Sequence, residues 1–159
     1  MRTLYNKFIE GTGKLRDIPL LLFRWVLAIG FFEPAMMKVK NLSSVAEWFE
    51  SMNYPLPMIS STLSMVTEVS GIILLVLGLG TRLISIPMMF IMVIATLTVH
   101  LPNGFPAGDN GFEIPLYYFV MLFALVIYGG GKYSLDHLWD KRLGRSRFRS
   151  NRIEAASPC

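Results

Sequence analysis

The segment from Met58 to Gly80 is a long apolar run with one carboxylate, Glu68, near its middle. A helix needs about 20 such residues to cross a bilayer, so this segment predicts a membrane span. Only Thr81 and Arg82 separate it from a second apolar run of similar length. Because a carboxylate is costly in lipid, Glu68 should face a protein interior or a wet cavity.

The composition indicates an integral membrane protein of one domain. The chain has 159 residues, of which 53% are hydrophobic and 16% charged, against about 25% charged residues in soluble proteins. Its single cysteine, Cys159, excludes an internal disulfide, an iron–sulfur site and a cysteine-based zinc site. The basic residues that give the net charge of +4 lie beside the apolar runs. The expected partner is therefore the lipid bilayer and not nucleic acid.

The hydropathy pattern predicts an all-α, integral membrane four-helix bundle. We expect spans at about 18–37, 58–80, 83–101 and 113–131, which together make a membrane domain of residues 18–131. Residues 1–17 form a basic leader, and residues 132–159 form a basic tail. Apolar residues at helical spacing predict a short amphipathic helix between the first and second spans.

The distribution of Lys and Arg predicts the orientation of the spans. Residues 1–17 hold four such side chains, and the segment from Lys132 onward holds seven. The loop between the third and fourth spans has none. The positive-inside rule therefore places both termini in the cytoplasm and the two longer connectors on the other side.

Two carboxylates in different spans fall at similar predicted depths. At 1.5 Å per residue, Glu33 lies about 22 Å and Glu68 about 18 Å from the cytoplasmic side. If they meet, repulsion should leave one of them protonated, which suits proton transfer coupled to quinone or substrate chemistry. Both are therefore candidate catalytic residues. The alternative is that they are neutralised, Glu68 by Arg24 or Glu33 by Lys38.

Other polar residues are expected near this carboxylate pair, most of them at the outer surface above it. Together they would form a pocket that opens outward, with the candidate ligand-binding residues Arg24, Lys38, His100, Asn103 and Glu113. His100 could carry a proton or bind a metal, or it could simply bond to a backbone carbonyl. The methionines are better explained as apolar filler than as a copper path, and no metal site is predicted.

The order of several short motifs resembles the DoxX family of small bacterial membrane proteins. The resemblance covers about residues 18–138 and rests on these pieces: Phe23-Arg24, Met37-Lys38, Glu68-Val69-Ser70-Gly71, Leu77-Gly78-Leu79-Gly80-Thr81-Arg82, His100-Leu101-Pro102-Asn103-Gly104-Phe105, Gly111-Phe112-Glu113 and the ending Gly129-Gly130-Gly131-Lys132-Tyr133-Ser134-Leu135-Asp136. The family usually carries a glycine, often after a histidine, where this chain has Glu33-Pro34-Ala35.

The resemblance implies a multi-pass protein of the bacterial inner (plasma) membrane. It also implies, in some relatives, a link to thiosulfate:quinone oxidoreduction or to membrane redox complexes. The first functional hypothesis is therefore a quinone-linked subunit of a redox complex, with a protein partner and no redox centre of its own. The alternatives are a binding or transport protein for a small solute or metal, and an accessory anchor for a partner enzyme. The sequence also leaves room for a homo-oligomer.

Overall fold

A computed structural model describes residue 15 and residues 17–142, and all regular secondary structure among them is helical. The elements are α2 (Asp17–Lys40), α3 (Leu42–Ser51), α4 (Pro57–Leu77), α5 (Thr81–Ala95), the π-helix η1 (Thr96–His100), the 3₁₀ turns η2 (Leu101–Asn103) and η3 (Ala107–Asp109), and α6 (Glu113–Tyr128). A further helix occupies residues 135–142. The predicted all-α class and the short helix between the first two spans, which is α3, are confirmed. The leader lies outside the described residues, apart from residues 15 and 17, as does the tail beyond residue 142.

Three helical segments are long and apolar enough to cross a membrane: Asp17–Lys40, Pro57–Leu77 and Thr81–Asn103. The fourth, α6, is apolar but has only 16 residues. Helix α6 ends at Tyr128, three residues before the expected boundary at about residue 131, and both Gly129 and Gly131 have positive φ angles. Glycine adopts that conformation at little cost and ends a helix by doing so. The fold therefore has three to four helices that could span a bilayer.

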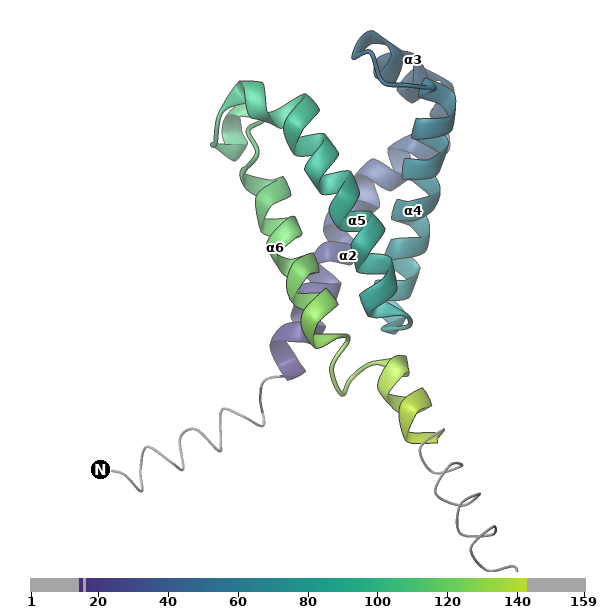
Figure 1. Ribbon diagram of the computed structural model, residues 1–159, viewed down its shortest axis with the longest axis vertical. Coiled ribbons are helices and arrows are strands. Elements are labelled where there is room, and N and C mark those ends of the chain that lie inside the picture. The colour runs from purple at the N-terminus through teal and green to yellow at the C-terminus, as the bar shows by residue number, and fades with distance from the viewer. Residues whose placement is uncertain (1–14, 16, 143–159) are drawn as a thin grey trace, which may run out of the picture.

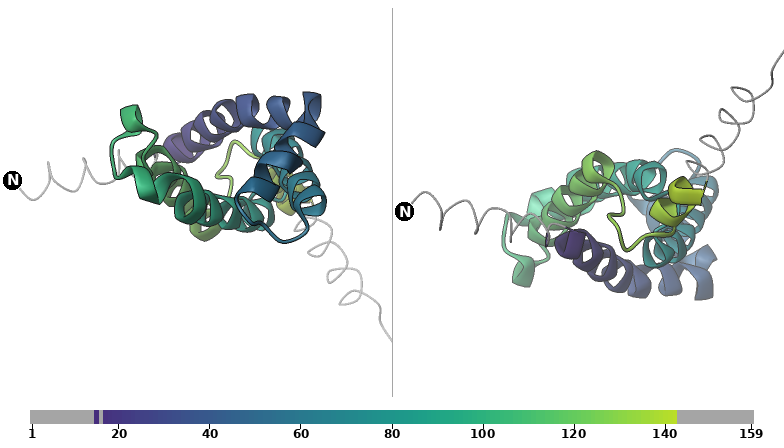
Figure 2. Two further views of the ribbon diagram at one scale, coloured as in Figure 1. Left: turned by 90° about the horizontal axis from the view of Figure 1, so that it is seen from above. Right: turned by 90° about the horizontal axis from the view of Figure 1, so that it is seen from below.

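The long helices pair as α2 with α4 and α5 with α6, and α3 packs on α4 (Figure 1). The start of α2, the α4–α5 turn and the end of α6 lie together at what we call the terminal end. We call the opposite end, which carries α3 and the loop from η2 to α6, the connector end. The view along the bundle shows α2, α3 and α4 grouped to one side of α5 and α6 (Figure 2).

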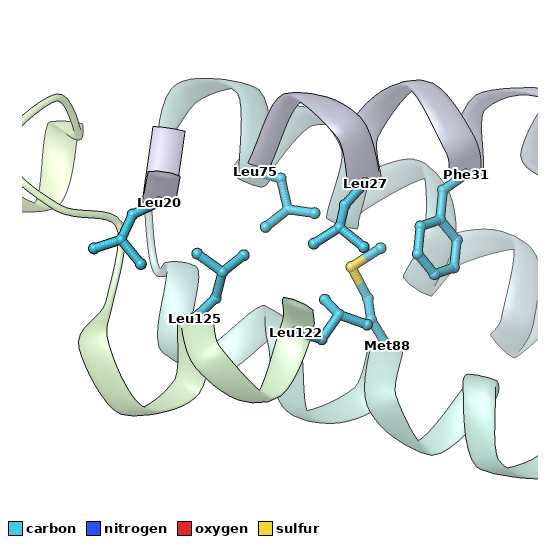
Figure 3. Close-up of a cluster of buried hydrophobic side chains, with 7 residues drawn as sticks. All are labelled: Leu20, Leu27, Phe31, Leu75, Met88, Leu122 and Leu125. Carbon is cyan, nitrogen blue, oxygen red and sulfur yellow. The ribbon is translucent and has the colours of Figure 1, made fainter. Parts of the chain in front are cut away.

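The apolar core lies in the half of the bundle nearer the terminal end. Its buried residues come from all four long helices (Figure 3): Leu20, Leu27, Phe31, Leu75, Met88, Leu122 and Leu125. Gly71 allows α4 to approach α5 closely here, because a Cβ at this position would overlap the Met88 side chain. On α4, the buried residues nearer the connector end are instead Ser61 and Glu68. Along α4, the buried residues thus change from apolar near the terminal end to polar nearer the connector end.

The outer faces of the bundle are apolar. Ile29, Leu83 and Phe90 are each about two-thirds or more exposed, at 70%, 76% and 66%. A soluble protein rarely exposes apolar surface on this scale, whereas a membrane domain presents it to lipid. The exposed faces and the helix lengths therefore agree on a multi-pass membrane protein.

Candidate functional site

A buried ion pair joins α2 to α4 on the connector side of the apolar core. The Lys38 ammonium donates to Glu68 Oε1 at 2.5 Å, and the Ser64 hydroxyl donates to the same oxygen at 3.0 Å. The Glu68 side chain is only 3% exposed and the Lys38 side chain 14%. Glu68 Oε2 is buried and has no hydrogen-bond partner among the described residues. We call Lys38, Ser64 and Glu68 the polar pair site.

Helical spacing explains why these side chains meet. Arg24, Phe31 and Lys38 are seven residues apart along α2, so they lie on nearly one face of the helix. On α4, Ser61, Ser64 and Glu68 follow one another at spacings of three and four, which also makes one face. These two inward faces place a cation of α2 opposite a carboxylate of α4.

Glu33 lies on the opposite face of α2 from the polar pair site. It follows Arg24 by nine residues, a rotation of about 180° at 100° per residue, and it is exposed. It has no hydrogen bond or ion pair within residues 17–142. The structure therefore does not assemble the predicted Glu33–Glu68 carboxylate pair, nor the alternative bridge from Glu33 to Lys38. The depth estimate ignored which way each helix face points.

Arg24 is also buried, at 1% exposed, but it does not contact Glu68. Its guanidinium donates to four backbone carbonyls, at Leu75 and Val76 near the end of α4 and at Gly130 and Tyr133 after α6, over distances of 2.7–3.0 Å. Carbonyl groups at a helix C-terminus carry partial negative charge, which favours a cation there. The alternative in which Arg24 neutralises Glu68 is therefore wrong, and Arg24 instead fastens the terminal end.

The segment after α6 is part of the bundle and not of a free tail. The Asp136 carboxylate accepts hydrogen bonds from the backbone N–H groups of Gly80 and Thr81, at 2.7 and 3.0 Å, and so caps the start of α5. The backbone N–H of Asp136 donates to the carbonyl of Gly78 at 3.0 Å. In the sequence, Ser134-Leu135-Asp136 and the glycine-rich α4–α5 turn appeared only as two separate motifs of one family pattern. Their contact was not predicted.

The remaining predicted pocket residues form a separate network at the connector end. His100 Nδ1 lies 2.8 Å from the carbonyl oxygen of Asn110, and the Asn103 amide donates to that oxygen at 3.3 Å. Glu113 accepts from the backbone N–H of Ala107 and from the hydroxyl of Tyr117, both at 2.9 Å. These bonds fix the loop between η2 and α6. None of these bonds reaches the polar pair site, so side-chain contacts do not join these residues to Lys38 and Glu68 in the predicted outward-opening pocket. His100 bonds to a backbone carbonyl, which was the simpler of its predicted alternatives.

The polar pair site offers a hydrogen-bond donor and an acceptor side by side. An ammonium group has three N–H donors, and only one of those on Lys38 has a partner within the described chain. Glu68 Oε2 can accept a hydrogen bond or take up a proton. Ser64 was missed by sequence reasoning, although its place four residues before Glu68 on one helix face was a usable signal. The described residues contain no group of three or more His, Cys, Asp or Glu that could hold a metal ion.

Fold and site together define a multi-pass helical membrane protein with a charged pair buried in its membrane domain. A family model described as DoxX matches residues 19–101. A protein of Haemophilus influenzae described as uncharacterized is 31% identical over 137 residues, which cover 84% of this chain and 89% of that protein. The chain belongs to the DoxX family. No solved structure matches it significantly.

Proposed function

We propose that this DoxX protein is a quinone-linked subunit of a redox complex in the bacterial plasma membrane, and that the polar pair site is where it binds the quinone head group and handles a proton. The observation that carries the proposal is Glu68 Oε2, a buried carboxylate oxygen without a partner in the described chain, beside the Lys38 ammonium. Leaving such an oxygen unpaired is costly, so a ligand or a proton is expected there.

The chemistry of the two side chains fits this ligand. A quinone head group has carbonyl oxygens, which accept hydrogen bonds, and its reduced form has hydroxyl groups, which donate them. Lys38 supplies the matching donors, and Glu68 Oε2 supplies the matching acceptor. Lys38 can donate to either redox form, and Glu68 Oε2 can accept from the hydroxyl of the reduced form.

A bound quinone would supply two-electron, two-proton redox chemistry. We assign the two electrons and one of the two protons to a partner protein, and the other proton to this chain. Glu68 Oε2 would accept one proton from the reduced form, while the ammonium of Lys38 and the hydroxyl of Ser64 keep Oε1 in place. A buried ion pair next to a lone acceptor can shift one proton without moving a helix, because only one oxygen of the carboxylate is already bonded.

The excess of Lys and Arg around the terminal end supports a cytoplasmic location for that end. The polar pair site then lies in the half of the bundle nearer the outer surface, since it is on the connector side of the apolar core. Quinones diffuse within the hydrocarbon layer, which includes this depth.

The proposal is tested by direct binding. The full chain is purified in mild detergent, and binding of decylubiquinone and its quinol is measured for the wild type, Glu68→Gln and Lys38→Gln. Loss of one charge-assisted hydrogen bond should weaken binding by about tenfold or more. Glu33→Gln is the matched control, because Glu33 is an exposed carboxylate on the helix that carries Lys38. No binding by the wild type, or equal binding by all four proteins, would contradict the proposal. Uptake of a solute into proteoliposomes without a redox partner would favour transport instead.

A further inference from the structure

A cavity of about 900 Å³ lies at the terminal end, away from the polar pair site. It is lined by the start of α5, the loop after α6 and the 135–142 helix. Figure 1 shows the loop after α6 and the 135–142 helix below the start of α5, at the lower end of the bundle. Their polar and aromatic side chains are not used by the proposed function.

Two of the carboxylates that line this cavity are already bonded. Asp136 caps the start of α5 through two backbone N–H groups. Asp17 accepts from the backbone N–H of Lys132 at 3.2 Å and pairs with the ammonium of the same residue at 3.2 Å. Arg82 and Asp140 also line the cavity, are exposed, and have no hydrogen bond or ion pair within residues 17–142. Besides the Lys132 ammonium, which pairs with Asp17, the cavity therefore presents a cation, Arg82, and a carboxylate, Asp140, that have no partner within residues 17–142.

Glycine at position 129 allows the guanidinium of Arg82 to lie against the backbone of the cavity. Gly129 has a φ of +76°, and a Cβ added there would come within 3.1 Å of Arg82 Nε. Any other side chain would be strained in this conformation and would press on the guanidinium. The turn after α6 thus determines the position of the Arg82 guanidinium.

The cavity lies where lipid head groups are found. Tyr128 and Trp139 line it and are exposed, at 68% and 64%. Aromatic side chains gather at the level of the head groups, and α6 ends at Tyr128. Guanidinium groups bind phosphate through paired hydrogen bonds, and carboxylates attract ammonium groups. A ligand at this level with both a phosphate and an ammonium is a zwitterionic phospholipid.

We propose that this cavity binds the head group of phosphatidylethanolamine, with its phosphodiester on Arg82 and its ammonium on Asp140. The inference is independent of the proposed function, because it shares no residue with the polar pair site. A lipid held here would brace the α4–α5 turn against the 135–142 helix. An anionic lipid without an amine would meet Asp140 with no compensating charge.

Native mass spectrometry of the full chain tests the assignment. The protein in mild detergent is incubated with phosphatidylethanolamine or phosphatidylglycerol of matched acyl chains, and the lipid retained per protein is counted. Arg82→Gln should retain about fivefold less phosphatidylethanolamine, whereas Arg82→Lys should keep most of it. The control is Arg142→Gln, since Arg142 is exposed and does not line the cavity.

A second variant tests the ammonium contact without touching Arg82. Asp140→Asn should reduce retention of phosphatidylethanolamine without reducing that of phosphatidylglycerol. Equal retention of the two lipids by the wild type would overturn the proposal. So would equal retention of phosphatidylethanolamine by Arg82→Gln and Arg142→Gln.

Discussion

Helix α2 carries two inward-facing cations, and their surroundings differ. Arg24, at the terminal end, donates to four backbone carbonyls. Lys38, fourteen residues later on nearly the same face, pairs with a carboxylate that keeps one oxygen unpaired in the described chain. Carbonyl groups do not titrate, so the Arg24 cluster has one charge state and serves the fold. The Lys38–Glu68 pair instead leaves one buried carboxylate oxygen without a hydrogen bond in the described chain, which is why we assign the proposed function to it.

The largest effect is expected from Arg24→Gln, which leaves several buried carbonyls without their donor. Each such group costs about 1–3 kcal/mol, so the sum is comparable with the whole stability of a domain. We expect little folded protein on purification in detergent. Arg24→Lys should not restore it, because one ammonium cannot reproduce the planar fork.

The control for this change is Arg142→Gln, which removes an exposed arginine near the same end of the bundle. Thermal unfolding followed by circular dichroism compares the two. If the Arg24→Gln protein melted within a few degrees of the control, the fastening role of Arg24 would be wrong.

Single substitutions in the polar pair site should come next. Glu68→Leu or Lys38→Met leaves the other charge buried without a partner, at a cost of about 3–5 kcal/mol. The double variant removes both charges and should regain most of this loss, since an apolar pair of similar volume is often as stable as a buried ion pair. A double-mutant cycle of unfolding free energies measures the coupling. Additive losses would show that the two side chains do not interact in the membrane.

A smaller loss is expected from Asp136→Asn. The carboxylate caps two backbone N–H groups at the start of α5, and removing its charge should cost about 1 kcal/mol, because negative charge is favoured at a helix N-terminus. The melting temperature should fall modestly. Asp140→Asn, four residues later and without a bond in the described chain, should leave it unchanged in the absence of added lipid. A larger effect at position 140 would contradict the capping assignment.

The smallest effect is expected at the connector end. The hydroxyls of Tyr54 and Thr98 lie 2.5 Å apart and join the α3–α4 turn to η1. Both side chains take part in an exposed contact, so Tyr54→Phe should cost less than about 1 kcal/mol. Hydrogen exchange of η1 is the sensitive measurement, and faster exchange confined to this region is the expected result. Destabilisation of the terminal end by this change would mean that the two ends are coupled.

The sequence was sufficient to predict the helices, because each membrane span is a long apolar run that can be recognised without knowing which helices it packs against. It placed Glu68 in a protein interior correctly, because a carboxylate in such a run has few other places to go. The prediction for Glu33 failed, because it used the depth of the residue along the helix and ignored the direction in which its side chain points around the helix axis. Counting 100° per residue from Arg24 would have set Lys38 inside and Glu33 outside.

The terminal end could not be predicted in the same way. Arg24 bonds to carbonyl groups, which every residue has, so no sequence pattern marks its partners. Asp136 binds backbone N–H groups of residues more than fifty positions earlier. The family motifs pointed to these segments without giving their contacts. The stretch from Gly129 to Asp136 thus belongs to the bundle for reasons that only the three-dimensional arrangement reveals.

The central claim is that Lys38 and Glu68 are kept for function and not for stability. The most direct measurement is made on the Lys38→Met/Glu68→Leu double variant, with thermal unfolding and decylubiquinone binding determined on the same preparation. We predict a melting temperature close to that of the wild type together with at least about a tenfold loss of quinone affinity. A folded double variant that binds quinone as the wild type does would contradict the claim.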